Sequence, residues 1–161
     1  MGTAAMRDVK LALELSPVFW QNVPEIQIKF NEIILFNGKL EQDKKFEWLL
    51  EANDLNRLSL FLINKTDADC QDGKDMAVNV NKIGIENFYY ENFMHATKYR
   101  PNYTDGYYTY AKENNLTVDP VIHSNYLGFN GEWWLEFTWP TFMWIYNLET
   151  NGLGWIYEKN V

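Results

Sequence analysis

Apolar and polar residues alternate over most of the chain, which is the period of half-buried β-strands. No segment combines the three-and-four spacing of an amphipathic helix with capping residues. The chain is therefore expected to be all-β. The alternation predicts strands around these apolar positions: Val9, Leu11, Leu13 and Leu15; Ile26, Ile28 and Phe30; Phe46, Trp48 and Leu50; Leu58, Leu60 and Leu62; Met76, Val78 and Val80; and Trp133, Leu135, Phe137 and Trp139.

Three interruptions add detail to this pattern. The short apolar run 33–36 ends at Asn37-Gly38, which is a hairpin-type turn signal. The alternation changes phase at Asn81-Lys82, which indicates a bulge or a bend. After Pro140, the apolar run 142–148 is interpreted as a further strand.

The middle of the chain, about residues 89–125, loses this periodicity. It is rich in Tyr and Asn and carries Pro101 and Pro120 near its ends. We interpret it as a long, irregular, Tyr-rich excursion, and such segments in compact domains usually serve function or assembly.

Turn-forming Gly and Asn residues recur along the chain, and no repeat of 20–50 residues is present. Many short strands separated by such turns favour an antiparallel two-sheet sandwich, jelly-roll-like in topology. A length of 161 residues suits one domain spanning 1–161.

The net charge and the aromatic content limit the classes of ligand and partner that the chain can bind. The formal net charge of −8 argues against nucleic acid and against an anionic membrane surface, since both need clustered Lys and Arg. No apolar run approaches the ~20 residues of a membrane span, and the N-terminal stretch lacks the apolar core of a signal peptide. The seven Trp, ten Tyr and ten Phe are more rings than a core needs, which favours an interface or a flat ligand.

Enzyme motifs are nearly absent. The two histidines, His95 and His123, have no zinc-type spacing, and Cys70 has no local partner that would mark a nucleophile. The chain is therefore expected to be non-enzymatic.

The stretch INKTDADCQDGKD, residues 63–75, carries the sharpest chemical signal. Asn64, Asp67, Asp69 and Asp75 could supply the carboxylate and amide oxygens that Ca²⁺ prefers. An EF-hand is excluded, because Val78 stands where its bidentate Glu is needed. A solvated turn between two strands explains the same residues, and both interpretations stay open.

Aromatic side chains outside the predicted core form the second candidate. Trp134 has the opposite parity to the core positions of its strand and is expected on the other face. The middle segment adds tyrosines that could stack on sugar rings or on another subunit. These ligand or subunit contacts are Tyr103, Tyr107, Tyr108, Tyr110 and Trp134.

Two blocks of the sequence resemble small virion-associated proteins that are encoded by marine tailed phages, including cyanophages. One is RLSLFLINKTDADCQDGKDMAVNVNKIGIENF, residues 57–88, and the other is YLGFNGEWWLEFTWPTFMWIYNLETNGLGWIY, residues 126–157. The resemblance implies a structural protein of the virion, on the capsid or on the tail, neck or fibre. It also implies partners among other virion proteins and copies of itself, and localisation in the virion after synthesis in the host cytoplasm.

The first block is also similar to calcium-dependent β-sandwich carbohydrate-binding modules. In those, a strand ends in an Asn/Asp-rich loop whose cation contacts sugar hydroxyls. This resemblance implies Ca²⁺ at Asn64, Asp67, Asp69 and Asp75, and a surface glycan as ligand. The leading hypothesis is a non-enzymatic virion protein with such a fold, and the alternative is a Ca²⁺-dependent glycan-binding module for host attachment.

Overall fold

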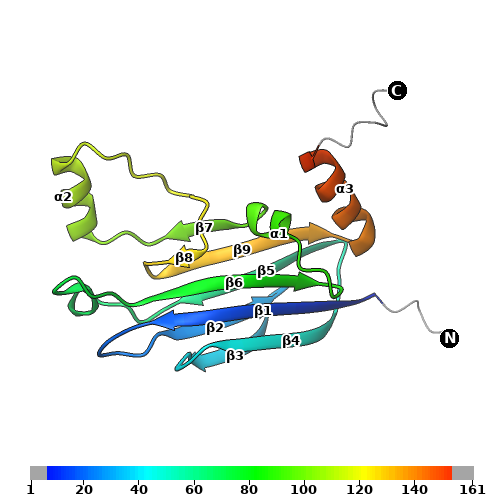
Figure 1. Ribbon diagram of the computed structural model, residues 1–161, viewed down its shortest axis with the longest axis horizontal. Coiled ribbons are helices and arrows are strands. Elements are labelled where there is room, and N and C mark those ends of the chain that lie inside the picture. Colours follow the sequence, from blue (N-terminus) through cyan, green and yellow to red (C-terminus); the bar gives the residue numbers. More distant parts are fainter. Residues whose placement is uncertain (1–6, 154–161) are drawn as a thin grey trace.

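The computed structural model describes residues 7–153, which form two antiparallel sheets packed face to face (Figure 1). The four-stranded sheet has the order β4 (Lys44–Glu51), β1 (Asp8–Val18), β6 (Ala77–Ile85), β8 (Tyr126–Leu127). The five-stranded sheet has the order β3 (Ile33–Lys39), β2 (Glu25–Phe30), β5 (Leu55–Leu62), β9 (Gly131–Thr138), β7 (Lys98–Pro101). The helices are η1 (Asp67–Cys70), α1 (Glu91–His95), α2 (Asp105–Glu113) and α3 (Thr141–Leu153).

The predicted all-β sandwich is confirmed, and its core lies between the sheets. The central strands β1, β2, β5, β6 and β9 turn their alternating apolar residues inward, as the sequence pattern predicts. Among the largest fully buried side chains are Trp133, Tyr99, Phe30, Phe93 and Phe137. That residues 1–161 form a single domain stays a prediction.

The phase change at Asn81-Lys82 is a β-bulge, which is one of the two structures that the sequence left open. Glu14 pairs with Lys82 while the next residue, Leu15, pairs with Val80, so Asn81 is left without a partner on β1. The extra residue lets positions on both sides of it point into the core, because it restores the inward parity.

The turn predicted at Asn37-Gly38 was wrong. The β2–β3 hairpin turns at Asn31-Glu32, and Phe30 pairs directly with Ile33 across it. Both turn residues have positive φ, 48° and 71°, as a two-residue primed turn requires. Backbone hydrogen bonding decides the position, since the Asn31 N–H donates to the Arg57 carbonyl on the neighbouring strand.

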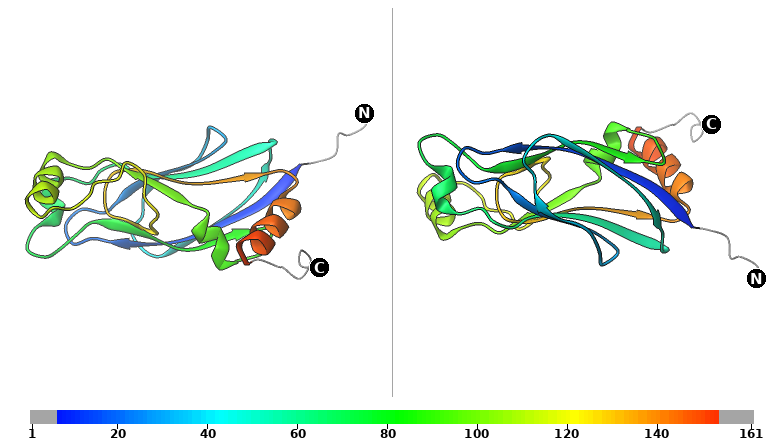
Figure 2. Two further views of the ribbon diagram at one scale, coloured as in Figure 1. Left: turned by 90° about the horizontal axis from the view of Figure 1, so that it is seen from above. Right: turned by 90° about the horizontal axis from the view of Figure 1, so that it is seen from below.

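The strand predicted over 142–148 was also wrong, because this run lies in helix α3. The helix places Trp144, Ile145 and Leu148 against the core and leaves Phe142 and Met143 exposed. A short apolar run rich in aromatic residues is consistent with either structure, and here packing across the end of the sandwich decides. Figure 2 places α3 and α2 at opposite ends of the sheets.

The middle segment is more regular than its sequence indicates. Residues 89–125 contain α1, α2 and the edge strand β7. β7 reaches β9 where Gly131 has a φ of +146°, and a Cβ there would lie 2.3 Å from the Arg100 carbonyl oxygen. Glycine is required at this crossing because no side chain fits.

Within residues 7–153, no helix is both long and apolar enough to cross a bilayer. The Trp155-Ile156-Tyr157 piece of the phage-like block lies outside the described residues.

Candidate functional site

The acidic loop is a folded element with its own hydrogen bonds. Its 3₁₀ turn, η1, begins with a capping box in which Thr66 and Asp69 satisfy each other's backbone groups. The Asp69 carboxylate accepts from the Thr66 N–H at 2.8 Å and from Asn22 Nδ2 at 3.0 Å, and Gln21 Nε2 lies at 3.4 Å. Burial raises the pKa of Asp69, but these hydrogen bonds outweigh burial and hold the pKa below its usual range.

Asn64 attaches the same loop to strand β2. Its Oδ1 accepts from the Glu25 N–H at 2.8 Å, and its Nδ2 donates to the Val23 carbonyl at 2.9 Å. Both ends of the amide are therefore engaged within the protein, and the side chain positions the loop.

Asp75 closes the loop through an ion pair. Its Oδ1 accepts from Lys65 Nζ at 2.5 Å and from the Met76 N–H at 2.8 Å, and its Oδ2 accepts from the Tyr126 hydroxyl at 2.6 Å. Burial raises the pKa of Asp75, and the hydrogen bonds from Lys65 and Tyr126 more than reverse this, so the carboxylate stays ionised. The pKa of Tyr126 is raised by its burial and by this carboxylate.

Helix α2 presents a row of tyrosines next to the loop. Thr104 caps the helix, because its side-chain oxygen accepts from the Tyr107 N–H. Tyr103 stacks on Tyr107 with 5.2 Å between ring centroids, and both rings contact Phe129 edge-on at 5.1 Å. Tyr110 continues the row and is about half exposed.

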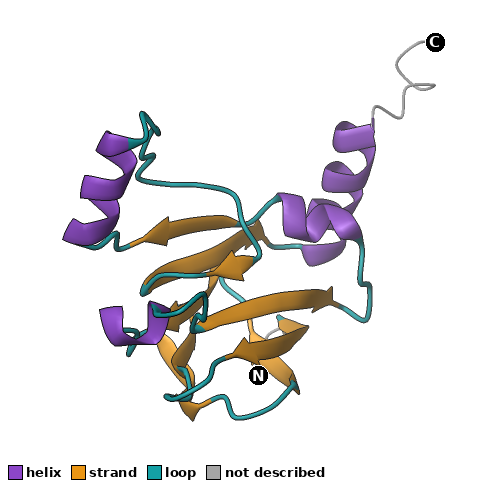
Figure 3. Ribbon diagram, turned by 60° about the vertical axis from the view of Figure 1, so that its left-hand side comes forward, coloured by secondary structure: helices purple, strands orange, loops and turns teal. Residues whose placement is uncertain are grey.

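The acidic loop and the tyrosine row face each other across a cavity of about 650 Å³. Figure 3 shows α2 standing above the short helical turn of the loop at one end of the sandwich. We call this the end cavity. It is lined by Lys65, Asp67, Cys70, Asp75, Tyr99, Thr104, Gly106, Tyr107, Tyr110, Ile122, Tyr126, Gly128 and Phe129.

The predicted site residues divide into three groups. Asp67, Asp75, Tyr107 and Tyr110 line the end cavity. Tyr103 stacks on Tyr107, and Asn64 and Asp69 hold the loop through hydrogen bonds within the protein without lining the cavity. Tyr108 is half exposed beside them.

Trp134 lies elsewhere, on the outer face of the five-stranded sheet as its parity predicts. Its ring is only 5% exposed, because the guanidinium carbons of Arg57 and Arg100 lie 4.3 and 4.7 Å from the ring centroid. The arginines cover the surface that a ligand would need.

Several cavity residues were not predicted from the sequence: Lys65, Tyr99, Tyr126 and Phe129. Tyr99 is buried, and its hydroxyl exchanges hydrogen bonds with the backbone of Phe129, which fixes the floor of the cavity. The stretches singled out in the sequence contained three of them, since Lys65 lies within residues 63–75 and Tyr126 and Phe129 lie within the phage-like block 126–157.

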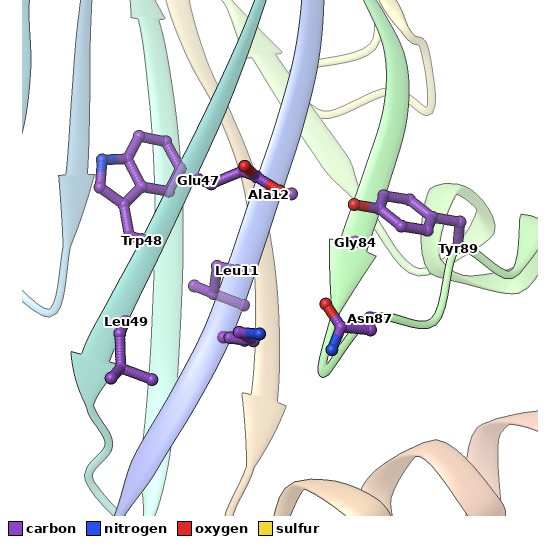
Figure 4. A pocket seen from close by; sticks show the side chains of 9 residues that line it. Leu11, Ala12, Glu47, Trp48, Leu49, Gly84, Asn87 and Tyr89 are labelled. Carbon is purple, nitrogen blue, oxygen red and sulfur yellow. The ribbon is translucent and has the colours of Figure 1, made fainter.

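A smaller hollow of about 260 Å³ lies on the outer face of the four-stranded sheet (Figure 4). The Tyr89 ring lies over Gly84, where a Cβ would come within 2.5 Å of it, and extends toward Ala12. Glu47 and Leu49 border the hollow on the other side.

Metal-binding groups do not gather in the described part of the chain. No three His, Cys, Asp or Glu side chains there come close enough to hold an ion. The ring centroids of His95 and His123 lie 6.0 Å apart, and no third ligand joins them among the described residues. At the loop, the carboxylates of Asp67, Asp69 and Asp75 do not converge on one point, and Asp75 is already paired with the Lys65 ammonium, so this donor set does not fit Ca²⁺.

The fold is a two-sheet β-sandwich similar to that of solved carbohydrate-binding modules. No protein-family model matches the chain, and no curated protein matches it. Among solved structures it is similar to vCBM60 in its selenomethionine form, from work on two families of calcium-dependent carbohydrate-binding modules linked by circular permutation. That match has a TM-score of 0.50 at 8% identity and covers 79% of this chain and 89% of the other.

vCBM60 in complex with galactobiose is similar at a TM-score of 0.48 and 8% identity, with coverage of 80% and 97%. At 8% identity, the match with a TM-score of 0.50 shows the fold alone.

Proposed function

We propose that the protein is a non-catalytic carbohydrate-binding module whose ligand lies in the end cavity. The observation that carries the proposal is the convergence on one cavity of two segments that are separate in the sequence, the acidic loop at residues 63–75 and the tyrosine row at residues 103–110. The fold of the module is consistent with this use.

The lining suits a saccharide chemically. Sugar rings have apolar C–H faces that pack on aromatic rings, and their hydroxyl groups bond to fixed polar groups. Tyr107, Tyr110 and Phe129 offer the rings, and the Lys65–Asp75 pair with the Tyr126 hydroxyl offers donors and acceptors. An ion pair of zero net charge favours a neutral glycan over an anionic one.

Replacing Tyr110 by alanine tests the site. The side chain is 54% exposed, so its loss will leave the fold intact while removing a stacking surface. We expect an affinity about 10- to 100-fold weaker, the range of a contact worth roughly 1.4 to 2.7 kcal/mol. A glycan array identifies the ligand for the wild-type protein, and calorimetry then measures both proteins.

Tyr89→Ala is the matched control, because Tyr89 is 41% exposed and lines the smaller hollow instead. Its affinity is expected to equal that of the wild type. A wild-type protein that binds no glycan on the array, or equal losses in both variants, would contradict the assignment of the end cavity.

A second role, as a structural component of a virion, is proposed on the apolar surface at the opposite end. Phe142 and Met143 of α3 and Leu55 of β5 are each 58–59% exposed. Exposed apolar groups of this kind favour contact with copies of the same chain in a particle. This proposal includes synthesis in the host cytoplasm, virion localisation and other virion proteins as partners.

Sedimentation velocity tests the second role. The purified protein is expected to form oligomers at micromolar concentration, and Met143→Glu is expected to shift them toward monomer because it places a charge in the contact. A protein that stays monomeric at every concentration and never co-sediments with particles would rule the role out.

A further inference from the structure

Lys65 is the central cation of the acidic loop. Its side chain is only 10% exposed, although Lys rarely lies so deep without a partner. The ammonium donates to Asp75 Oδ1 and to the Gly128 carbonyl, both at 2.5 Å, and lies 5.6 Å from the centroid of the Phe129 ring. The group thus has an anionic, a carbonyl and an aromatic partner.

The backbone of Lys65 is fixed as firmly as its side chain. Its N–H donates to Asn130 Oδ1 at 2.8 Å, and its carbonyl accepts from Asn130 Nδ2 at 3.0 Å. One residue therefore joins the acidic loop to the segment between β8 and β9. A loop-bound cation would join the same segments, because it too would contact a carboxylate and backbone carbonyls.

Two other predicted calcium ligands of the loop, Asp69 and Asn64, are engaged without a metal. Asp69 accepts from Thr66, Asn22 and Gln21, and Asn64 uses both ends of its amide. A divalent ion at Asp75 would lie beside the ammonium, and the repulsion between like charges in a partly buried site would oppose its binding.

We propose that the Lys65 ammonium takes the place of a loop cation in this module, so that the end cavity is built and works without Ca²⁺. The claim about folding stands on the loop geometry alone. The claim about saccharide binding rests on the proposed function, because the same Lys65–Asp75 pair faces the cavity.

The first test measures the melting temperature of the wild-type protein with EDTA and with 5 mM CaCl₂ (about a hundredfold above a 50 μM Kd). The melting temperatures in EDTA and in CaCl₂ are expected to differ by less than about 1 °C. A Ca²⁺ site saturated about a hundredfold above its Kd raises the melting temperature by roughly 5 to 10 °C. A rise of that size would overturn the proposal.

The second test replaces the ammonium by a neutral side chain of similar length. Lys65→Met leaves Asp75 without its ion pair, so a fall in melting temperature of at least about 5 °C is expected. Lys74→Met is the matched control, since Lys74 is exposed on the same loop and lies over the Trp20 ring at 4.9 Å. An unchanged melting temperature in Lys65→Met would overturn the proposal.

If Lys65→Met does not fold, the loss of the fold itself supports the structural role, and the Ca²⁺ titration of the wild type still decides the rest. Saccharide affinity forms a separate arm. For any glycan that the wild type binds, EDTA is expected to leave the affinity unchanged, and a tenfold loss in EDTA would overturn the proposal. Because the two melting-temperature tests need no glycan, their outcome is independent of the proposed function.

Discussion

Replacing Trp133 by alanine is expected to lower the free energy of unfolding by about 3–5 kcal/mol, the range for removing a buried Trp or Phe side chain. Trp133 is fully buried in the middle of β9, between Leu60 of β5 and Tyr99 of β7. Neighbouring strands are hydrogen-bonded on both sides and cannot close around the space, so a cavity remains. Urea unfolding followed by tryptophan fluorescence and circular dichroism measures the loss.

Trp133→Phe is the matched control. The Trp133 Nε1 has no hydrogen-bond partner among the described residues, so phenylalanine removes a buried polar group along with part of the ring. Removing the polar group stabilises the protein, whereas removing part of the ring destabilises it. The free energy of unfolding is therefore expected to fall by less than about 2 kcal/mol. Equal losses in both variants would show that the size of the side chain at 133 is not what stabilises the sandwich.

Replacing Asp69 by asparagine is expected to lower the free energy of unfolding at pH 7 by about 2–3 kcal/mol, the range for losing hydrogen bonds to a buried charged group. Asparagine has the same shape but turns an NH₂ group toward donors on Thr66, Asn22 or Gln21. Those donors then lose their acceptor. Asp67→Asn, on the exposed side of the same turn, is expected to change stability by less than about 0.5 kcal/mol.

The Asp69 effect also depends on pH. The pKa of Asp69 is lowered in the folded protein, so its ionised form adds stability that is fully present above the unfolded value of about 3.9. That stability fades as pH falls from about 4 through the folded pKa. The difference in stability between wild type and Asp69→Asn is therefore expected to shrink as the pH falls below about 4, and a difference that stays constant there would contradict the role of the charge.

The strands can be predicted from the alternation of apolar and polar residues because a half-buried strand must turn every second residue inward. The change of phase at Asn81 was found in the same way, since one extra residue shifts the parity of everything after it. The hairpin was misplaced because Asn37-Gly38 is a strong local signal, whereas the real turn at Asn31-Glu32 is held by contacts with β5.

Helices were missed where packing outweighs local pattern. The run 142–148 has no polar alternation, and its helical form depends on Trp144 meeting Phe93 and Phe137. α2 did leave a signal, because Tyr103, Tyr107 and Tyr110 are spaced by four and three residues, with Thr104 as a cap. This spacing is typical of a helix, but the segment that contains it was predicted to be irregular.

By itself, the sequence determined the class of fold, the change of phase at Asn81 and the two polar and aromatic segments of the candidate site, because these depend on residue period and composition. Only the tertiary structure decided how the site is built. It placed Trp134 behind two arginines and brought the tyrosine row to the acidic loop. It also paired the side-chain oxygens of Asn64, Asp69 and Asp75 with the Lys65 ammonium and with backbone N–H donors, because hydrogen bonding and burial depend on partners that only the fold brings together.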